Sequence, residues 1–184
     1  LEKLNYRTNT QNGLRCHNRL GDKGFCIFNE LSENEGDIVL LGDSLTDAIL
    51  SNLIEQVSNT KYRLIHMSYS GNLYFPEFLA VRKRDNRVDQ DETYHKYRQE
   101  YLSNLYGKNY IIIAGNYSYF FEEQRIKLKN ENLKIYSTAR KFVDKNSINK
   151  NKEDRILELK LKFKDTIKKL AEQNKVILLY PMPQ

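Results

Sequence analysis

An apolar run that ends in Gly42-Asp43-Ser44-Leu45 constrains the fold of this chain more than any other feature. Residues 38–41 are wholly apolar, as is typical of a strand in a parallel sheet that is covered on both faces. Residues 46–58 then carry apolar side chains at helical spacing. The pattern therefore predicts a strand, a tight turn and a helix, with Ser44 in the turn. Open α/β sheets bind ligands at this edge, and a helix N-terminus supplies unpaired N–H groups and a partial positive charge.

The alternation of strand and helix continues along the chain. We predict further strands at residues 62–67, 110–114 and 175–180, and helices at residues 90–106 and 152–173. Residues 1–36 lack periodicity and are predicted to be an irregular lead-in before a domain at residues 37–184; residues 115–150 are predicted to be a loop or an insertion. This order of elements indicates a three-layer α/β/α sandwich with a parallel sheet.

Composition excludes several classes of function. The chain has 184 residues, which suits one domain. Its mean hydropathy is -0.71, and no run of about 18 apolar residues occurs, so we do not expect this portion to span a membrane. The net charge is +6, but the basic residues are interleaved with 24 acidic ones, and no nucleic-acid-binding motif accompanies them. The Gly-Lys-Ser/Thr of a phosphate-binding loop is also absent.

Cys16 and Cys26 lie near each other in the predicted lead-in. They are either two free thiols or a local disulfide, and a disulfide requires an oxidising compartment. A zinc site is disfavoured because only His17 lies nearby and a fourth ligand is missing.

Polar residues follow three of the predicted strands, in Gly42-Asp43-Ser44, Ser70-Gly71-Asn72 and Ala114-Gly115-Asn116. Because parallel strands end at the same edge of a sheet, we expect Ser44, Gly71 and Asn116 to converge. Glycine lets the backbone approach closely, and asparagine offers an uncharged N–H donor, as an oxyanion hole requires. The pattern points to acyl transfer on a serine. The alternative is that Asp43 and Ser44 only cap a helix.

These three blocks resemble those of the SGNH (GDSL) hydrolase family, with Ala114 in place of a glycine and Tyr117 where aspartate is common. The resemblance implies a flavodoxin-like fold with Ser44 as the nucleophile. It also implies an oxyanion hole made by the N–H groups of Ser44 and Gly71 and the side-chain amide of Asn116. Neither a metal nor a cofactor is implied.

In this family the general base is a histidine in an Asp-x-x-His block near the C-terminus. The histidines of this chain, His17, His66 and His95, are not in such a block. We predict that His66 is a core or edge residue and that His95 lies on a helix. The first residue is Leu, and the sequence stops at Gln184, before that block would be reached. We therefore expect a C-terminally truncated part of a longer protein that is inactive alone.

A narrower resemblance spans most of the chain. It rests on the paired cysteines, on the segment at residues 116–121, which is rich in aromatic residues, and on the final strand. These features resemble the extracytoplasmic SGNH domain fused to the membrane-embedded acyltransferase family 3 domain. The resemblance implies a Cys16–Cys26 disulfide, a periplasmic or cell-surface location, and a membrane acyltransferase domain as partner. The implied reaction is O-acetylation of a surface polysaccharide, with a carbohydrate as acceptor. Many such domains have tryptophan in place of Asn116 and histidine in place of Leu45, so this chain departs from them there.

Two alternatives stay open. The first is a free-standing GDSL esterase or lipase, and the second is a non-catalytic carbohydrate-binding module of the same fold. Four aromatic residues, at positions 117 and 119–121, either line a sugar-binding wall or belong to the core.

Overall fold

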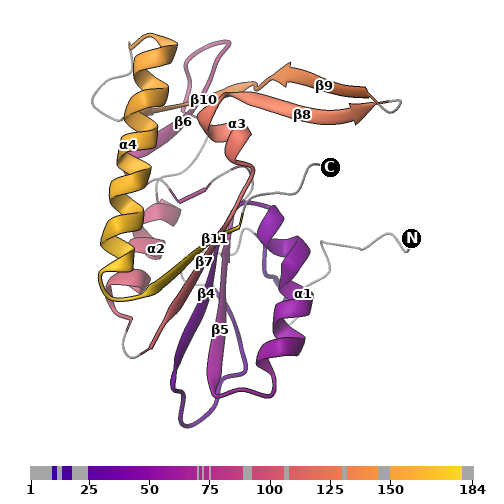
Figure 1. Cartoon of the computed structure of the whole chain (residues 1–184), viewed down its shortest axis with the longest axis vertical. Helices are drawn as coiled ribbons and strands as arrows, with labels where there is room; N and C mark the ends of the chain where they lie inside the picture. Colours follow the sequence, from indigo (N-terminus) through magenta and orange to yellow (C-terminus); the bar gives the residue numbers. More distant parts are fainter. Residues whose placement is uncertain are drawn as a thin grey trace.

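A five-stranded sheet in the order β11-β7-β4-β5-β3 forms the centre of the molecule (Figure 1). Its strands are β3 (Cys26–Phe28), β4 (Gly36–Gly42), β5 (Tyr62–Ser68), β7 (Tyr110–Ala114) and β11 (Lys175–Leu179). All are parallel except β3, which pairs antiparallel with β5. The computed structural model describes residues 10–11, 14–17, 25–69, 71, 73–74, 76–88, 93–105, 108–129, 132–144 and 150–179.

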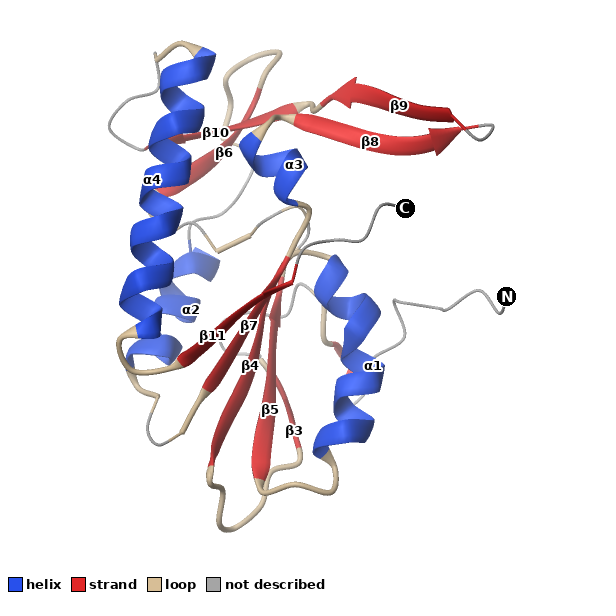
Figure 2. Ribbon diagram, viewed as in Figure 1, coloured by secondary structure: helices blue, strands red, loops and turns tan. Residues whose placement is uncertain are grey.

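Helices cover both faces of this sheet. Helix α1 (Leu45–Val57) lies on one face, and α2 (Thr93–Ser103) and α4 (Lys152–Ala171) lie on the other (Figure 2). Because side chains alternate along a strand, Leu40 packs with the α1 cluster while Val39 and Leu41 pack with the larger cluster under α4. The predicted three-layer α/β/α arrangement is confirmed, with the addition of one antiparallel edge strand.

Local signals explain the longest helix. The side chain of Asn151 caps α4 by accepting a hydrogen bond from the N–H of Asp154. Acidic residues occupy the first turn of α4, and Lys168 and Lys169 occupy the last, which complements the helix dipole. Leu159 and Phe163 are buried against the core, as the spacing predicts.

A second group of elements lies beyond the end of the sheet at which α1 begins (Figure 1). It contains α3 (Tyr117–Phe121), the hairpin of β8 (Gln124–Lys129) and β9 (Asn132–Ser137), and β10 (Arg140–Asp144), which pairs antiparallel with β6 (Phe78–Arg82). Residues 115–150 are thus a folded insertion that contains a helix and three strands rather than a loop. Strand β6 was not predicted at all, because its partner lies about sixty residues further along the chain.

The lead-in also contains ordered structure. The short strands β1 (Thr10–Gln11) and β2 (Leu14–Arg15) pair with each other, and β3 joins the central sheet. Cys16 and Cys26 form a disulfide and are buried. The division into residues 1–36 and 37–184 stays a prediction, although β3 shows that the end of the lead-in packs as part of the sheet.

Candidate active site

Ser44 lies in the turn between β4 and α1. The residue is exposed, whereas Gly42 and Asp43 before it are buried. Ser44 is the N-cap residue of α1, yet its side chain makes no capping hydrogen bond. The Asp43 carboxylate instead accepts from the N–H of Leu45 at 2.9 Å. The structure therefore does not support the interpretation in which Ser44 serves as a helix cap; Asp43 does this, and the Ser44 hydroxyl is not used for it.

The backbone at Gly42 requires glycine. Its φ is +157°, and a Cβ atom there would lie 1.8 Å from the carbonyl oxygen of Ala114 on the neighbouring strand. The same close approach places the N–H of Asp43 3.3 Å from that oxygen. The end of β4 and the end of β7 are thus brought together without an intervening side chain.

Asp43 joins the first polar segment to the third. One carboxylate oxygen accepts from Leu45, and the other accepts from the N–H of Asn116 at 2.9 Å. Burial raises the pKa of the Asp43 carboxyl, against the opposing effects of these two hydrogen bonds and of the Arg98 charge. This buried carboxylate therefore acts as a structural brace between the turns that carry Ser44 and Asn116.

The second segment reaches the same edge of the sheet through β5. The N–H of Tyr69 donates to the carbonyl of Gly42 at 3.0 Å. A Cβ atom on Gly115 would lie 2.6 Å from a methyl carbon of Leu73, so the segment also meets the third one. Gly71 lies in the chain between Tyr69 and Leu73, and its φ of +62° favours glycine. Ser70 and Asn72 lie outside the described residues.

Asn116 is half-buried and begins α3. Its side-chain oxygen accepts from the N–H of Tyr119 at 3.2 Å and from the hydroxyl of Ser118 at 3.1 Å. Because the oxygen is engaged within the helix, the Nδ2 group of the same amide is left as the donor that can point elsewhere. The amide therefore keeps a donor available, as the predicted role of Asn116 in an oxyanion hole requires.

The structure thus brings together the three segments in which Ser44, Gly71 and Asn116 were predicted to act. The hydroxyl belongs to an exposed residue at the N-terminus of α1, and the turn before it is bonded to the segments that contain Gly71 and Asn116. A glycine N–H and an amide N–H placed around a serine hydroxyl stabilise negative charge on the carbonyl oxygen that the serine attacks. The catalytic roles of the three residues stay predictions.

Sequence reasoning missed Arg98, which α2 inserts beneath this edge. Arg98 is fully buried, and its Nη2 donates to the carbonyls of Gly42 at 2.9 Å and Met67 at 2.6 Å. It therefore ties the ends of β4 and β5 together directly below the Ser44 turn. Nothing in the sequence distinguishes this arginine from the exposed cations near it, such as Lys96.

The described histidines contact Asp47 rather than Ser44. His66 Nε2 lies 3.3 Å from Asp47 and 3.1 Å from the hydroxyl of Thr46, and His17 Nδ1 lies 2.9 Å from Asp47. Burial lowers the pKa of His66 to about 4, so it is neutral at pH 7. His66 is a core residue, as predicted. The side chain of His95 lies outside the described residues.

The aromatic residues after Asn116 belong mainly to the core. Tyr117, Tyr119 and Phe120 are buried, and Phe120 packs edge-to-face on Phe142 of β10. This packing removes three of the four residues from the proposed sugar-binding wall. Only Phe121 is partly exposed.

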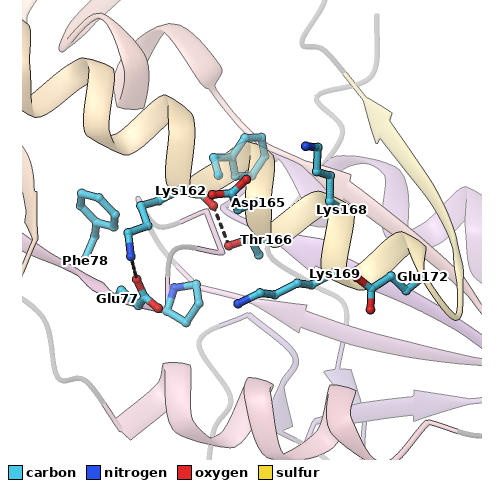
Figure 3. Close-up of a pocket in the computed structure, with 10 residues that line it drawn as sticks. Glu77, Phe78, Lys162, Asp165, Thr166, Lys168, Lys169 and Glu172 are labelled. Carbon is cyan, nitrogen blue, oxygen red and sulfur yellow. Dashed lines mark hydrogen bonds and ion pairs between the residues drawn. The ribbon is translucent and has the colours of Figure 1, made fainter.

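A groove of about 300 Å³ lies elsewhere, between residues 76–78 and the outer part of α4 (Figure 3). An ion pair of Lys162 with Glu77, 2.5 Å apart, crosses it, and Lys169 extends along it. None of Ser44, Gly71 and Asn116 lines this groove. In the part of the chain that the structure describes, no cluster of three or more histidines, cysteines or carboxylates is arranged to hold a metal ion.

The fold and this edge of the sheet define a serine-type hydrolase or acyltransferase of the α/β class. The chain belongs to the family described as the SGNH domain fused to AT3 domains, which matches residues 15–184. The fusion that this description names supports attachment to a membrane acyltransferase. No curated protein and no solved structure gave a significant match. Across the described residues, no helix has the length and apolar character needed to cross a bilayer.

Proposed function

We propose that this domain transfers an acyl group, most simply acetyl, to a hydroxyl of a cell-surface polysaccharide through an acyl-enzyme on Ser44. The observation that carries the proposal is the side chain of Ser44, an exposed N-cap residue of α1 whose hydroxyl makes no capping hydrogen bond, while Asp43 accepts from the N–H of Leu45. The family assignment supports the reaction class. The fusion to AT3 domains supports an extracytoplasmic domain that receives its acetyl group from a membrane partner.

The chemistry takes two steps. In the first, Ser44 Oγ attacks the acyl carbonyl carbon while its proton passes to a general base. The tetrahedral oxyanion accepts hydrogen bonds from the N–H groups of Ser44 and Gly71 and from Asn116 Nδ2. The bond to the leaving group then breaks, and the base returns the proton to that group.

In the second step, a sugar hydroxyl attacks the acyl-serine and gives its proton to the base. The bond between the acyl carbon and Ser44 Oγ then breaks, and the base returns the proton to Ser44 Oγ. An esterase differs only in that water takes the place of the sugar. Since neither His17 nor His66 hydrogen-bonds to Ser44, we assign the base to the Asp-x-x-His block that the family resemblance implies. Each oxyanion donor is expected to contribute on the order of 10²–10³ in rate.

The test is Ser44→Ala in the full-length protein, with the O-acetyl content of the polysaccharide measured by NMR. We expect acetylation to be abolished. Ser103→Ala is the matched control, because it removes an exposed helix serine whose hydroxyl bonds only to the carbonyl of Glu100. Unchanged acetylation in Ser44→Ala would refute the proposal.

A second candidate is a carbohydrate-binding module that keeps the fold without catalysis. It is favoured by the absence, among the described residues, of a histidine bonded to Ser44. One experiment distinguishes the two candidates. The purified full-length protein is incubated with a labelled acetyl donor, and peptide mass spectrometry determines whether the labelled acetyl group is on Ser44. A labelled Ser44 peptide excludes the binding module, whereas polysaccharide binding that Ser44→Ala leaves intact, with no label, favours it.

A further inference from the structure

A buried carboxylate one helical turn after Ser44 is clamped between two histidines. Asp47 lies in the first turn of α1 and is 5% exposed. One of its oxygens is 2.9 Å from His17 Nδ1, and the other is 3.3 Å from His66 Nε2. A buried carboxylate without donors is strongly unfavourable, so these contacts hold the first turn of α1 in place.

The two histidines differ in origin. His66 belongs to β5, is buried and neutral, and its Nε2 also lies 3.1 Å from Thr46 Oγ1, which donates to the carbonyl of Asp43. His17 comes from the lead-in and is 18% exposed. His66 is thus part of the sheet, whereas His17 belongs to the lead-in and contacts Asp47 from outside the sheet.

The Nδ1 atom of His17 contacts residues of two elements, α1 and β5. Besides Asp47, its Nδ1 lies 2.9 Å from the hydroxyl of Ser68, the last residue of β5. Ser68 is the register partner of Gly42 at the end of β4. His17 therefore bridges the start of α1 and the end of β5, on either side of the segment that leads to Ser44.

A covalent tether holds His17 at this place. Its neighbour Cys16 is joined by the disulfide to Cys26, and Cys26 is the register partner of His66 across β3 and β5. The side chain of Gln11 also pairs with the backbone of Ile27, next to Cys26. The disulfide thus anchors the backbone next to His17 to β3, the strand that pairs with β5, which carries the other histidine of the clamp.

We propose that His17 is a positioning residue for Ser44, held against Asp47 and Ser68 by the Cys16–Cys26 disulfide. Without His17, Asp47 in the first turn of α1 keeps only its contact with His66. The Ser44 hydroxyl then loses its fixed position relative to the proposed oxyanion donors. A misplacement of about 1 Å in a reacting group is enough to lower a rate about a hundredfold. The catalytic consequence rests on the proposed function, whereas the structural clamp does not.

The test compares His17→Ala with His17→Asn in the full-length protein. Asparagine can place an N–H where the imidazole Nδ1 stands but has no atom at the position of Nε2. We expect His17→Ala to lower kcat by about tenfold to a hundredfold with KM little changed, and His17→Asn to recover kcat to within about threefold of the unaltered protein. The Cys16→Ala/Cys26→Ala double variant should resemble His17→Ala and should add little to it.

A second readout does not need activity. Hydrogen exchange of the amides in residues 45–50 should accelerate about tenfold in His17→Ala and stay near its original rate in His17→Asn. Asn34→Ala is the matched control, because its exposed side chain donates to the carbonyl of Leu31 and belongs neither to the disulfide nor to the His17 contacts; it should change neither readout by more than about twofold.

Two outcomes would overturn the proposal. If both His17 variants lose kcat equally and exchange does not change, His17 acts through Nε2 as a proton acceptor rather than as a positioning residue. If neither readout responds to His17→Ala, the clamp has no role. Should Ser44→Ala prove fully active, the function proposed above fails, but the exchange measurement still decides whether His17 holds the helix.

Discussion

The N–H of Asn116 donates to the carboxylate of Asp43 across 2.9 Å, and this contact joins residues 73 positions apart in the chain. The other oxygen of the same carboxylate caps α1 at Leu45. One buried side chain therefore sets both the start of the helix that follows Ser44 and the position of the turn that carries Asn116. The aspartate of the Gly-Asp-Ser turn is a brace whose loss would disturb the turns of Ser44 and Asn116 at once.

We predict that Asp43→Asn lowers acyl transfer about tenfold or more. Asparagine has a single side-chain oxygen, so one of the two N–H donors loses its acceptor and meets an NH₂ group instead. An unsatisfied buried donor costs about 1–3 kcal/mol. Part of this loss is offset, because the variant no longer buries a charge. Activity together with urea unfolding separates the two effects, with Asp85→Asn as a surface control expected to stay within about 0.5 kcal/mol. A variant with full activity would show that the brace is dispensable.

The two glycines of the site should respond differently to alanine. At Gly42 a Cβ atom would lie 1.8 Å from the backbone oxygen of Ala114, and a strand in the middle of the sheet cannot move away. We expect Gly42→Ala to prevent folding or to destabilise the domain by more than about 3 kcal/mol.

At Gly71 a Cβ atom would lie 2.9 Å from Arg140 Nη1, the end of a flexible side chain that can shift. The remaining penalty is the φ of +62°, which costs a non-glycine residue about 1–2 kcal/mol. Gly71→Ala should therefore fold, with Tm lowered by a few degrees. Alanine keeps the N–H, so activity falls only if relief of the strain at this φ displaces an N–H that serves as an oxyanion donor. Circular dichroism melts and activity at a temperature below both transitions give the comparison. Equal stability of the two variants would contradict this account.

The local part of this fold was predictable from the sequence. The apolar run at residues 38–41 predicts β4, and the turn at Ser44 followed by helical spacing predicts α1. Both elements were predictable because each forms through contacts between neighbouring residues in the chain. Strands β6 and β10 were missed because each is stabilised by a partner far away in the chain rather than by its own pattern. Strand β3 was missed for a similar reason: it is three residues long and is held by β5 and a disulfide.

The candidate site shows the same division. Ser44, Gly71 and Asn116 were predicted as site residues because each follows a strand and has a recognisable chemistry, and their roles stay predictions. Arg98, which holds strand ends beneath them, and His17, for which we propose a positioning role, were not assigned such roles, because their contacts exist only in the folded chain. Arg98 lies on a polar helix, and His17 lies in a segment without periodicity, so neither carries a local signal.

The burial of His66 predicts a loss of stability in mild acid. Its pKa is lowered from 6.5 to about 4 in the folded state. Above pH 6.5 the group is neutral in both states, and its contribution to stability is fully present. As the pH falls from 6.5 towards 4, only the unfolded chain takes up the proton, so the free energy of unfolding decreases by up to about 3 kcal/mol. Asp43 acts in the opposite sense, because its raised pKa favours the folded state at low pH.

His66→Gln isolates this effect, because glutamine retains an N–H donor for Asp47 and Thr46 but does not titrate. We expect the variant to lose less stability than the unaltered protein between pH 7.5 and pH 4.5 in urea unfolding experiments. Parallel losses in the two proteins would assign the acid sensitivity to another group.

Asn116 is at once the proposed side-chain donor of the oxyanion hole and the N-cap of α3, the helix that opens residues 115–150. Its side-chain oxygen is bonded within α3, and the nitrogen of the same amide turns with that oxygen about a single torsion. Anything that tilts α3, such as an acceptor chain resting on the elements that follow it, must therefore rotate the nitrogen as well. If the amide nitrogen binds the oxyanion as proposed, thermodynamic reciprocity requires that an anion bound there change the affinity for that acceptor chain by the same factor. Binding of an acceptor chain beside α3 and stabilisation of negative charge at the Asn116 amide are then coupled.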